Sequence, residues 1–191
     1  SDSNTARAEE AVNTSIALAP DDTVYVAFEY DYGFSSNSHV VVKKFDGDTW
    51  VTVGSPEFDS GGTNEVMMEI APSGTPYVVY QDKDNGDRAT VQSYNGSSWK
   101  VVGSAGFSAD MAQHITLSID SNNVPYVLYE DWGDANNGAS VMKYTGSGSE
   151  IDATAGDGWE YVGSQGFSPD TPAYGDIALD SDDLPYVAYA D

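Results

Sequence analysis

An aspartate-rich segment is the part of this sequence whose residue types best suit a metal ion. Asn85 and Gly86 stand among acidic residues that recur at nearly alternate positions. Hard cations such as Ca²⁺ take oxygen ligands in this kind of spacing, and a glycine allows the sharp turn that brings the ligands together. This segment and a matching one later in the chain therefore predict calcium-stabilised loops, with the candidate ligands Asp82, Asp84, Asp87, Asp131 and Asp134.

The sequence leaves a simpler role open for two of these aspartates. Asp82, Asp131 and Asp191 each follow a tyrosine by two residues, at the end of an expected strand. Aspartate at such a position commonly accepts hydrogen bonds from backbone N–H groups and so fixes the turn. The pattern thus predicts either a metal ligand or a turn-fixing acceptor at these positions.

Four aromatic residues near the ends of expected second strands are the candidate ligand-binding groups. They are Tyr30, Tyr32, Phe34 and Trp132. Aromatic rings present a flat apolar surface, which in Tyr and Trp also has a polar edge. Beside Asp and Asn side chains, such a surface suits the ring of a sugar. These residues therefore predict a carbohydrate-binding rim as the alternative to a purely structural role.

No arrangement typical of a catalytic site is visible. The chain has no cysteine and neither a G-x-S-x-G nor an H-E-x-x-H motif. Its two histidines, His39 and His114, lie in unrelated segments, whereas a hydrolytic triad needs a histidine beside a nucleophile and an acid. Paired carboxylates of the glycosidase kind stay open because the chain has 31 acidic residues, but no pair stands out. We therefore expect a non-catalytic protein, with glycoside hydrolysis as a less favoured alternative.

The charge balance limits the classes of partner that the protein can bind. The chain carries 31 acidic and 7 basic residues, for a net charge of −24. Nucleic acid is excluded as a partner, because phosphate binding needs clustered Lys and Arg. No apolar run approaches the length of a transmembrane helix, so no membrane insertion is expected. Strong acidity, few lysines and turns rich in Gly, Ser and Asn favour a secreted or cell-surface protein.

The chain is built from a repeat, whose strands must position the loops that carry the candidate aspartate and aromatic residues. A strand, a tight turn and a second strand occur four times, and a tyrosine begins each second strand: Tyr25, Tyr77, Tyr126 and Tyr186. A W-x-x-V-G motif begins at Trp50, Trp99 and Trp159, so the tryptophans are 49 and 60 residues apart. A third strand precedes each of these tryptophans. One repeat is therefore four short strands.

Four short antiparallel strands at such a period are typical of a β-propeller blade. We predict an all-β fold in which residues 1–191 form a single propeller domain of four-stranded blades. The expected boundaries are about 13–54 for blade 1, 67–103 for blade 2, 115–163 for blade 3 and 176–191 for half of a fourth blade. The third repeat is longer because an insertion at 147–157 precedes its fourth strand.

Blades hide their apolar faces by stacking, so aromatic residues of the Tyr126, Tyr129, Trp99 and Phe107 kind are expected between them. About 3.5 blades do not close a ring, and an open ring exposes apolar faces and a sheet edge, which proteins normally avoid. The predicted ring is therefore incomplete, or it is completed by another chain or segment. The expected partner is a second copy, as a homo-oligomer or polymer, or the remainder of a longer chain.

The motifs also carry a resemblance to known proteins. The succession of PYVxYxD, VMKYxG, W-x-x-V-G and GFS resembles the multi-repeat β-propeller segments of secreted and surface proteins in bacteria and archaea, and more distantly the blades of NHL-type propellers. This resemblance implies the fold, and no catalytic motif transfers with it. The expected function is an extracellular or cell-surface binding or structural module, self-assembling and calcium-stabilised. A lectin-like propeller that binds glycans is the alternative.

Overall fold

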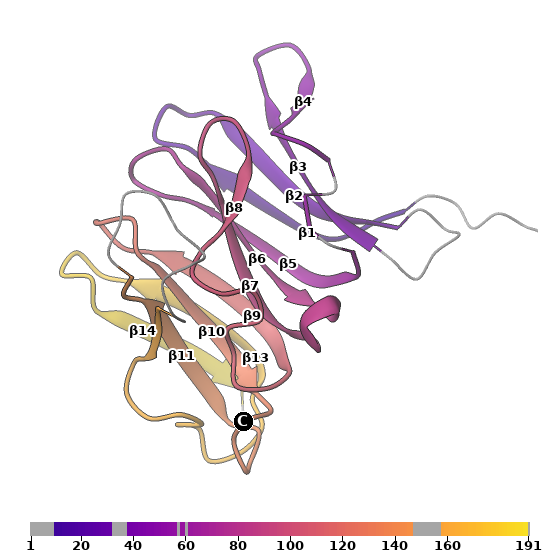
Figure 1. The fold of residues 1–191 in the computed structure, drawn as a ribbon. Coiled ribbons are helices and arrows are strands. Elements are labelled where there is room, and N and C mark those ends of the chain that lie inside the picture. The colour runs from indigo at the N-terminus through magenta and orange to yellow at the C-terminus, as the bar shows by residue number, and fades with distance from the viewer. Residues whose placement is uncertain (1–9, 32–37, 57, 60, 147–157, 191) are drawn as a thin grey trace, which may run out of the picture.

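The chain folds into a row of antiparallel β-sheets. The structure, a computed structural model, describes residues 10–31, 38–56, 58–59, 61–146 and 158–190. Three four-stranded sheets and one two-stranded sheet follow one another in chain order, from the indigo sheet to the yellow one (Figure 1). Each sheet is a meander in which sequence neighbours pair, so the predicted four-stranded blades and the predicted half-blade are confirmed.

The strands occupy the segments that the repeat predicts. Blade 1 consists of β1 (Glu10–Leu18), β2 (Val24–Asp31), β3 (Ser38–Phe45) and β4 (Trp50–Thr52). Blade 2 consists of β5 (Thr63–Ile70), β6 (Pro76–Asp82), β7 (Arg88–Tyr94) and β8 (Trp99–Val101), with the short 3-10 helix η1 (Lys83–Asn85) after β6. Blade 3 consists of β9 (Ala112–Ile119), β10 (Pro125–Asp131), β11 (Ala139–Tyr144) and β12 (Trp159–Tyr161). Half-blade 4 consists of β13 (Ala173–Leu179) and β14 (Pro185–Ala190).

The first strand of each blade starts three or four residues earlier than predicted, because a β-bulge interrupts it. The pairing register shifts at one point in all four blades. An extra residue breaks the period-2 alternation of side chains, so the strand pattern in the sequence stops short at the bulge. The insertion predicted at 147–157 lies outside the described residues.

The same bulge position carries a non-glycine residue with positive φ in every blade. These residues are Asn13, Glu65, His114 and Tyr174, with φ of 49°, 54°, 52° and 64°. Left-handed backbone is unfavourable for residues with a Cβ, and such outliers gather where a site needs a particular side-chain direction. The first strands of consecutive blades lie next to one another, so the bulges form one row through the molecule.

A tryptophan lock joins consecutive blades. Trp99 of blade 2 stacks on Phe58, which follows blade 1, at a ring separation of 4.5 Å, and its indole N–H donates to the carbonyl oxygen of Val53 at 2.9 Å. The same lock joins blades 2 and 3, with a ring separation of 3.9 Å and a hydrogen bond of 2.9 Å, through Trp159, Phe107 and Val102. The expected inter-blade placement of Trp99 and Phe107 is thereby confirmed.

Apolar cores fill the spaces between blades. One core joins blades 1 and 2, a second joins blades 2 and 3, and a smaller one lies between blade 3 and half-blade 4. All seven residues of β6 and of β10 are buried, because each strand has a blade on both sides. Tyr129 and Tyr126 lie in two different inter-blade cores, as expected.

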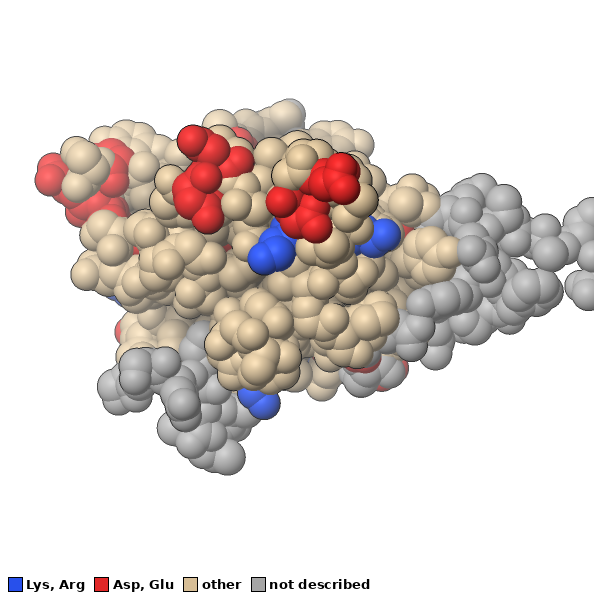
Figure 2. Space-filling model, turned by 90° about the horizontal axis from the view of Figure 1, so that it is seen from above, with Lys and Arg blue, Asp and Glu red and all other residues tan. Residues whose placement is uncertain are grey.

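Most of the charged side chains are acidic. Asp and Glu gather in separate groups on the face of Figure 2, with only a few Lys and Arg between them. Among the described residues, no helix has the length and apolarity that a membrane-spanning segment needs.

Candidate functional site

Asp82 holds the loop after the second strand of blade 2 in place. Its carboxylate is 3% exposed and accepts hydrogen bonds from the Asn85 amide at 2.9 Å and the Thr90 hydroxyl at 2.8 Å. The Thr90 oxygen in turn accepts from the backbone N–H of Gly106 at 2.8 Å. The aspartate therefore ties the second strand, the third strand and the loop that leads to the next blade.

Asp131 does the same in blade 3 with more donors. It is fully buried and accepts from the backbone N–H of Gly133 at 2.9 Å and the Ser140 hydroxyl at 2.8 Å. The Gln165 amide at 3.1 Å and the Tyr161 hydroxyl at 3.3 Å also donate to it. Asp131 thus accepts from a backbone N–H of the turn, the alternative that the sequence left open, whereas the donors to Asp82 are the side chains of Asn85 and Thr90.

The other predicted calcium ligands do not converge with these two. Asp84 is exposed, and Asp87 and Asp134 are half-buried. Backbone N–H groups of Asn136 and Gly138 lower the pKa of Asp134, which marks a turn acceptor. Within the described ranges, no group of three or more His, Asp or Glu side chains is arranged to hold a metal ion. The buried carboxylates of Asp82 and Asp131 accept hydrogen bonds from protein donors, and calcium binding at these loops stays a prediction.

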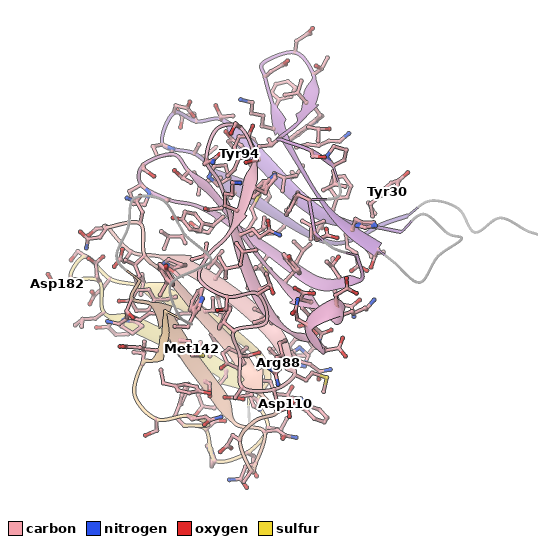
Figure 3. The ribbon with its side chains drawn as sticks, viewed as in Figure 1. Tyr30, Arg88, Tyr94, Asp110, Met142 and Asp182 are labelled. Carbon is pink, nitrogen blue, oxygen red and sulfur yellow. The ribbon has the colours of Figure 1, made fainter. Side chains whose placement is uncertain are left out.

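The predicted aromatic rim is split between blades. Trp132 follows β10 and is 42% exposed. Tyr30 lies at the end of β2, edge-on to Phe28 at a ring separation of 6.4 Å. It lies on the right in Figure 3, whereas Asp182, in the turn of half-blade 4, lies on the left. Tyr30 belongs to blade 1 and Trp132 to blade 3, with blade 2 between them, so a shared aromatic rim stays a prediction. Tyr32 and Phe34 lie outside the described residues.

Trp132 instead meets residues that the sequence did not single out together. It lies near Glu130, whose pKa it lowers and whose side chain is only 4% exposed. Nε2 of His114 lies 3.7 Å from Oε2 of Glu130, within ion-pair range but longer than a hydrogen bond. The His114 ring lies 5.0 Å from the ring of Tyr174, which is 77% exposed. We call these four residues, His114, Glu130, Trp132 and Tyr174, the bulge cluster.

The bulge cluster combines a buried carboxyl group with exposed rings. Burial raises the pKa of Glu130, the charge of His114 and the hydrogen bond from Trp132 lower it, and the nearby carboxylate of Glu65 raises it again, so the net direction is upward. A small cavity borders His114 and Glu130, and Tyr189 of half-blade 4 lines its other side. The cluster therefore places a buried carboxyl group near two exposed rings, Trp132 and Tyr174.

Sequence reasoning missed His114 because its partners are distant in the chain. It was set aside for lack of a nearby nucleophile, whereas Glu130 reaches it across the pairing of β9 with β10. His39 likewise pairs with Asp59, with Nδ1 and Oδ1 2.7 Å apart. The sequence holds no recurring residue type at the bulge position, which is occupied by Asn13, Glu65, His114 and Tyr174.

Comparison with known proteins supports the fold. No protein-family model and no curated protein matches the sequence. Among solved structures, it is similar to a protein of unknown function from Dyadobacter fermentans DSM 18053 (14% identity, TM-score 0.61, 95% of this chain and 63% of that one). It is also similar to an α-L-arabinanase of Penicillium chrysogenum complexed with arabinobiose (11%, 0.61, 94% and 57%). A third is a mutant of AofleA from Arthrobotrys oligospora (16%, 0.55, 98% and 54%).

At these identities the likeness shows the fold alone, and that fold is the β-propeller. The chain spans between 54% and 63% of the length of these three structures. The resemblance of the repeat to secreted and surface propellers of bacteria and archaea stays a prediction.

The half-buried carboxyl group of Glu69 gives a pH-dependent expectation. Burial raises the pKa of Glu69, which lies on β5 opposite Tyr77, above its ordinary value of 4.5. An acid whose pKa is raised by folding contributes stability below its unfolded pKa and loses it as pH rises through the folded value. We expect Glu69→Gln to be more stable than the parent at pH 7, with the gain shrinking below about pH 4.5. Thermal melts across this range measure it. The exposed Glu160→Gln should show no such gain, and an equal gain would contradict the burial argument.

Proposed function

We propose that this chain is a non-catalytic carbohydrate-binding β-propeller segment whose ligand contacts the bulge cluster. The observation that carries the proposal is that two exposed rings, Trp132 and Tyr174, lie near the buried Glu130 and the ring of His114. Ligand sites typically combine apolar and aromatic walls with a few precisely placed polar groups. A sugar has both a C–H face that packs on an aromatic ring and hydroxyl groups that bind a histidine or a phenol.

The buried position of Glu130 favours binding over hydrolysis. A glycosidase acid must reach the glycosidic oxygen, whereas Glu130 is 4% exposed and is engaged by Trp132 and His114. Its raised pKa and the nearby Glu65 carboxylate are the features that favour glycoside hydrolysis as the second candidate. A structural role for Glu130 accounts for its raised pKa and for the nearby Glu65 carboxylate without any catalytic step.

Binding of arabino-oligosaccharides and a broad glycan array to the purified chain tests the proposal. Arabinobiose is the first probe, because a fold neighbour was crystallised with it. Trp132→Ala should weaken saccharide binding about thirtyfold, the effect of removing a central aromatic anchor worth about 2 kcal/mol.

Trp50→Ala is the matched control, because Trp50 is 46% exposed but distant in the fold, at the start of the last strand of blade 1. Equal losses in the two variants, or no saccharide binding by the parent chain, would overturn the proposal. Release of arabinose from arabinobiose that Glu130→Gln abolishes would favour the hydrolase instead.

A further inference from the structure

The buried carboxyl group of the bulge cluster lacks a strong positive partner. Glu130 is 4% exposed, and its ion pair with His114 has a separation of 3.7 Å, which is longer than a hydrogen bond. Within the described part of the chain, both ion pairs use a histidine and neither uses Lys or Arg. A carboxylate removed from water is costly unless it is closely paired or hydrogen-bonded. This place therefore favours a ligand that brings positive charge.

Glu65 adds a second carboxyl group to the same place. Its Oε2 accepts a hydrogen bond at 3.3 Å from the backbone N–H of Ile115, the residue after His114. Its charge raises the pKa of Glu130, so the two carboxyl groups are close enough to repel each other. Glu65 is only half-buried, so a ligand can reach its carboxyl group from the surface. Two carboxyl groups are thus opposed by one histidine, and the local balance of charge is negative when both are ionised.

These residues belong to blades that have neighbours on both sides. Glu65 lies on β5 of blade 2, and His114 and Glu130 lie on β9 and β10 of blade 3. Blade 1 packs on blade 2, and half-blade 4 packs on blade 3, through apolar cores. The surroundings of the two carboxyl groups are therefore a property of the blades themselves and do not depend on where the row of blades begins or ends.

Trp132 gives a cation a second kind of contact. Its ring is 42% exposed and lies near Glu130. The face of an aromatic ring attracts a positive charge, and tryptophan does so most strongly. No lysine or arginine of the described residues fills this role, because Lys143 is the cation in their one cation–π contact and its ring is Tyr126. A positively charged ligand group would thus meet a ring and two carboxyl groups together.

We propose that the saccharide bound at the bulge cluster is an amino sugar, whose ammonium group lies between the Trp132 ring and the carboxyl groups of Glu65 and Glu130. The inference rests on the proposed function, because it names the class of saccharide for the same site. A neutral sugar hydroxyl leaves the carboxylates without a positive partner. An ammonium group donates up to three hydrogen bonds, and bonds between charged partners are stronger than those between neutral ones.

Two trisaccharides with the same linkage test the inference. Chitotriose, the trimer of D-glucosamine, carries an amino group on each sugar where cellotriose, the trimer of D-glucose, carries a hydroxyl. At about pH 7 most of these amines are protonated, as α-amino groups are, whose pKa is about 7.7–8.0. Isothermal titration calorimetry should show that chitotriose binds about tenfold more tightly than cellotriose, the gain from one hydrogen bond between charged partners. Added salt should reduce this ratio of affinities by screening.

Single substitutions locate the preference for the amine. Glu65→Gln removes one of the two carboxyl charges and should lower the ratio of the two affinities about threefold. Glu160→Gln is the matched control, because it removes the same charge from the exposed face of the outer strand β12, and it should leave the ratio unchanged. Trp132→Ala should weaken the binding of chitotriose. Circular dichroism and thermal melts verify that each variant folds.

Three results would overturn the inference. If cellotriose binds as tightly as chitotriose, the site does not select an ammonium group, although the proposed carbohydrate function stands. If Glu65→Gln and Glu160→Gln lower the ratio equally, the net charge of −24 attracts the amine and the bulge cluster does not. If the parent chain binds neither trisaccharide nor any sugar of the glycan array, the inference and the proposed function fail together.

Discussion

Replacing Trp99 by alanine is expected to destabilise the protein by about 3–5 kcal/mol, the cost of removing a large buried aromatic side chain. The tryptophan is 7% exposed, stacks on Phe58 and donates to the carbonyl of Val53, so its loss opens a cavity and leaves a carbonyl unpaired between two blades. At roughly 2–4 °C per kcal/mol, the melting temperature should fall by about 10 °C. Differential scanning calorimetry measures the fall.

Two further variants separate the contributions to this lock. Trp99→Phe keeps a ring on Phe58 but removes the donor, and it should cost about 1–2 kcal/mol. Trp50→Ala removes the tryptophan at the same repeat position in blade 1, where it is 46% exposed and contacts Phe45 at 5.5 Å, and should cost below about 1 kcal/mol. If Trp50→Ala and Trp99→Ala were equally destabilising, stacking between blades would not be what the tryptophan provides.

Replacing Asp131 by alanine is expected to cost about 3 kcal/mol or more of unfolding free energy. The carboxylate is fully buried, and its removal leaves the N–H and O–H donors of Gly133, Ser140 and Gln165 without this acceptor. The change should therefore loosen the third strand and the loop after blade 3 together. Chemical denaturation gives the free energy, and hydrogen exchange should show faster exchange at Gly133 and at Gly166, whose N–H bonds the Ser140 hydroxyl.

Asp134→Ala is the matched control in the same loop. Its carboxylate accepts from the backbone N–H groups of Asn136 and Gly138 at 3.1 Å and 3.3 Å but is half-buried, so the loss should stay near 1 kcal/mol. If Asp131 were a calcium ligand, a chelator would destabilise the parent protein. If chelator lowers the melting temperature of the parent and not of Asp131→Ala, the aspartate is a ligand and the hydrogen-bond account is incomplete.

The fold followed from local features of the chain. Alternating apolar residues, turn residues such as Gly74 and Asn123, and the tryptophan period act within or between sequence neighbours, so strand number, blade number and the half-blade could all be predicted. The recurring tryptophan and phenylalanine predicted inter-blade packing, because no four-stranded blade can bury both of its own faces. The β-bulges in the first strands could not be predicted, because one inserted residue interrupts the alternation by which a strand is recognised in a sequence.

The candidate site could be predicted only in part. Trp132 and Tyr30 were singled out by residue type and by their position at the end of a second strand, which the structure bears out for both. The sequence could not decide whether Asp82 and Asp131 are metal ligands or hydrogen-bond acceptors, because both roles need an aspartate at the same position. Which role holds depends on donors such as Thr90 and Gln165, which come from other strands and loops.

Sequence by itself determined the repeat, the strand order and the residues available at each blade boundary, because these depend on period and on turn chemistry along the chain. The tertiary structure alone decided which side chains meet: Glu130 lies near Trp132 and His114, and Ser121 donates to Asp183. It also decided that Tyr126 is buried and Tyr186 exposed. Those contacts join residues from different strands or blades, and their geometry is set by the bulges and the stacking of sheets.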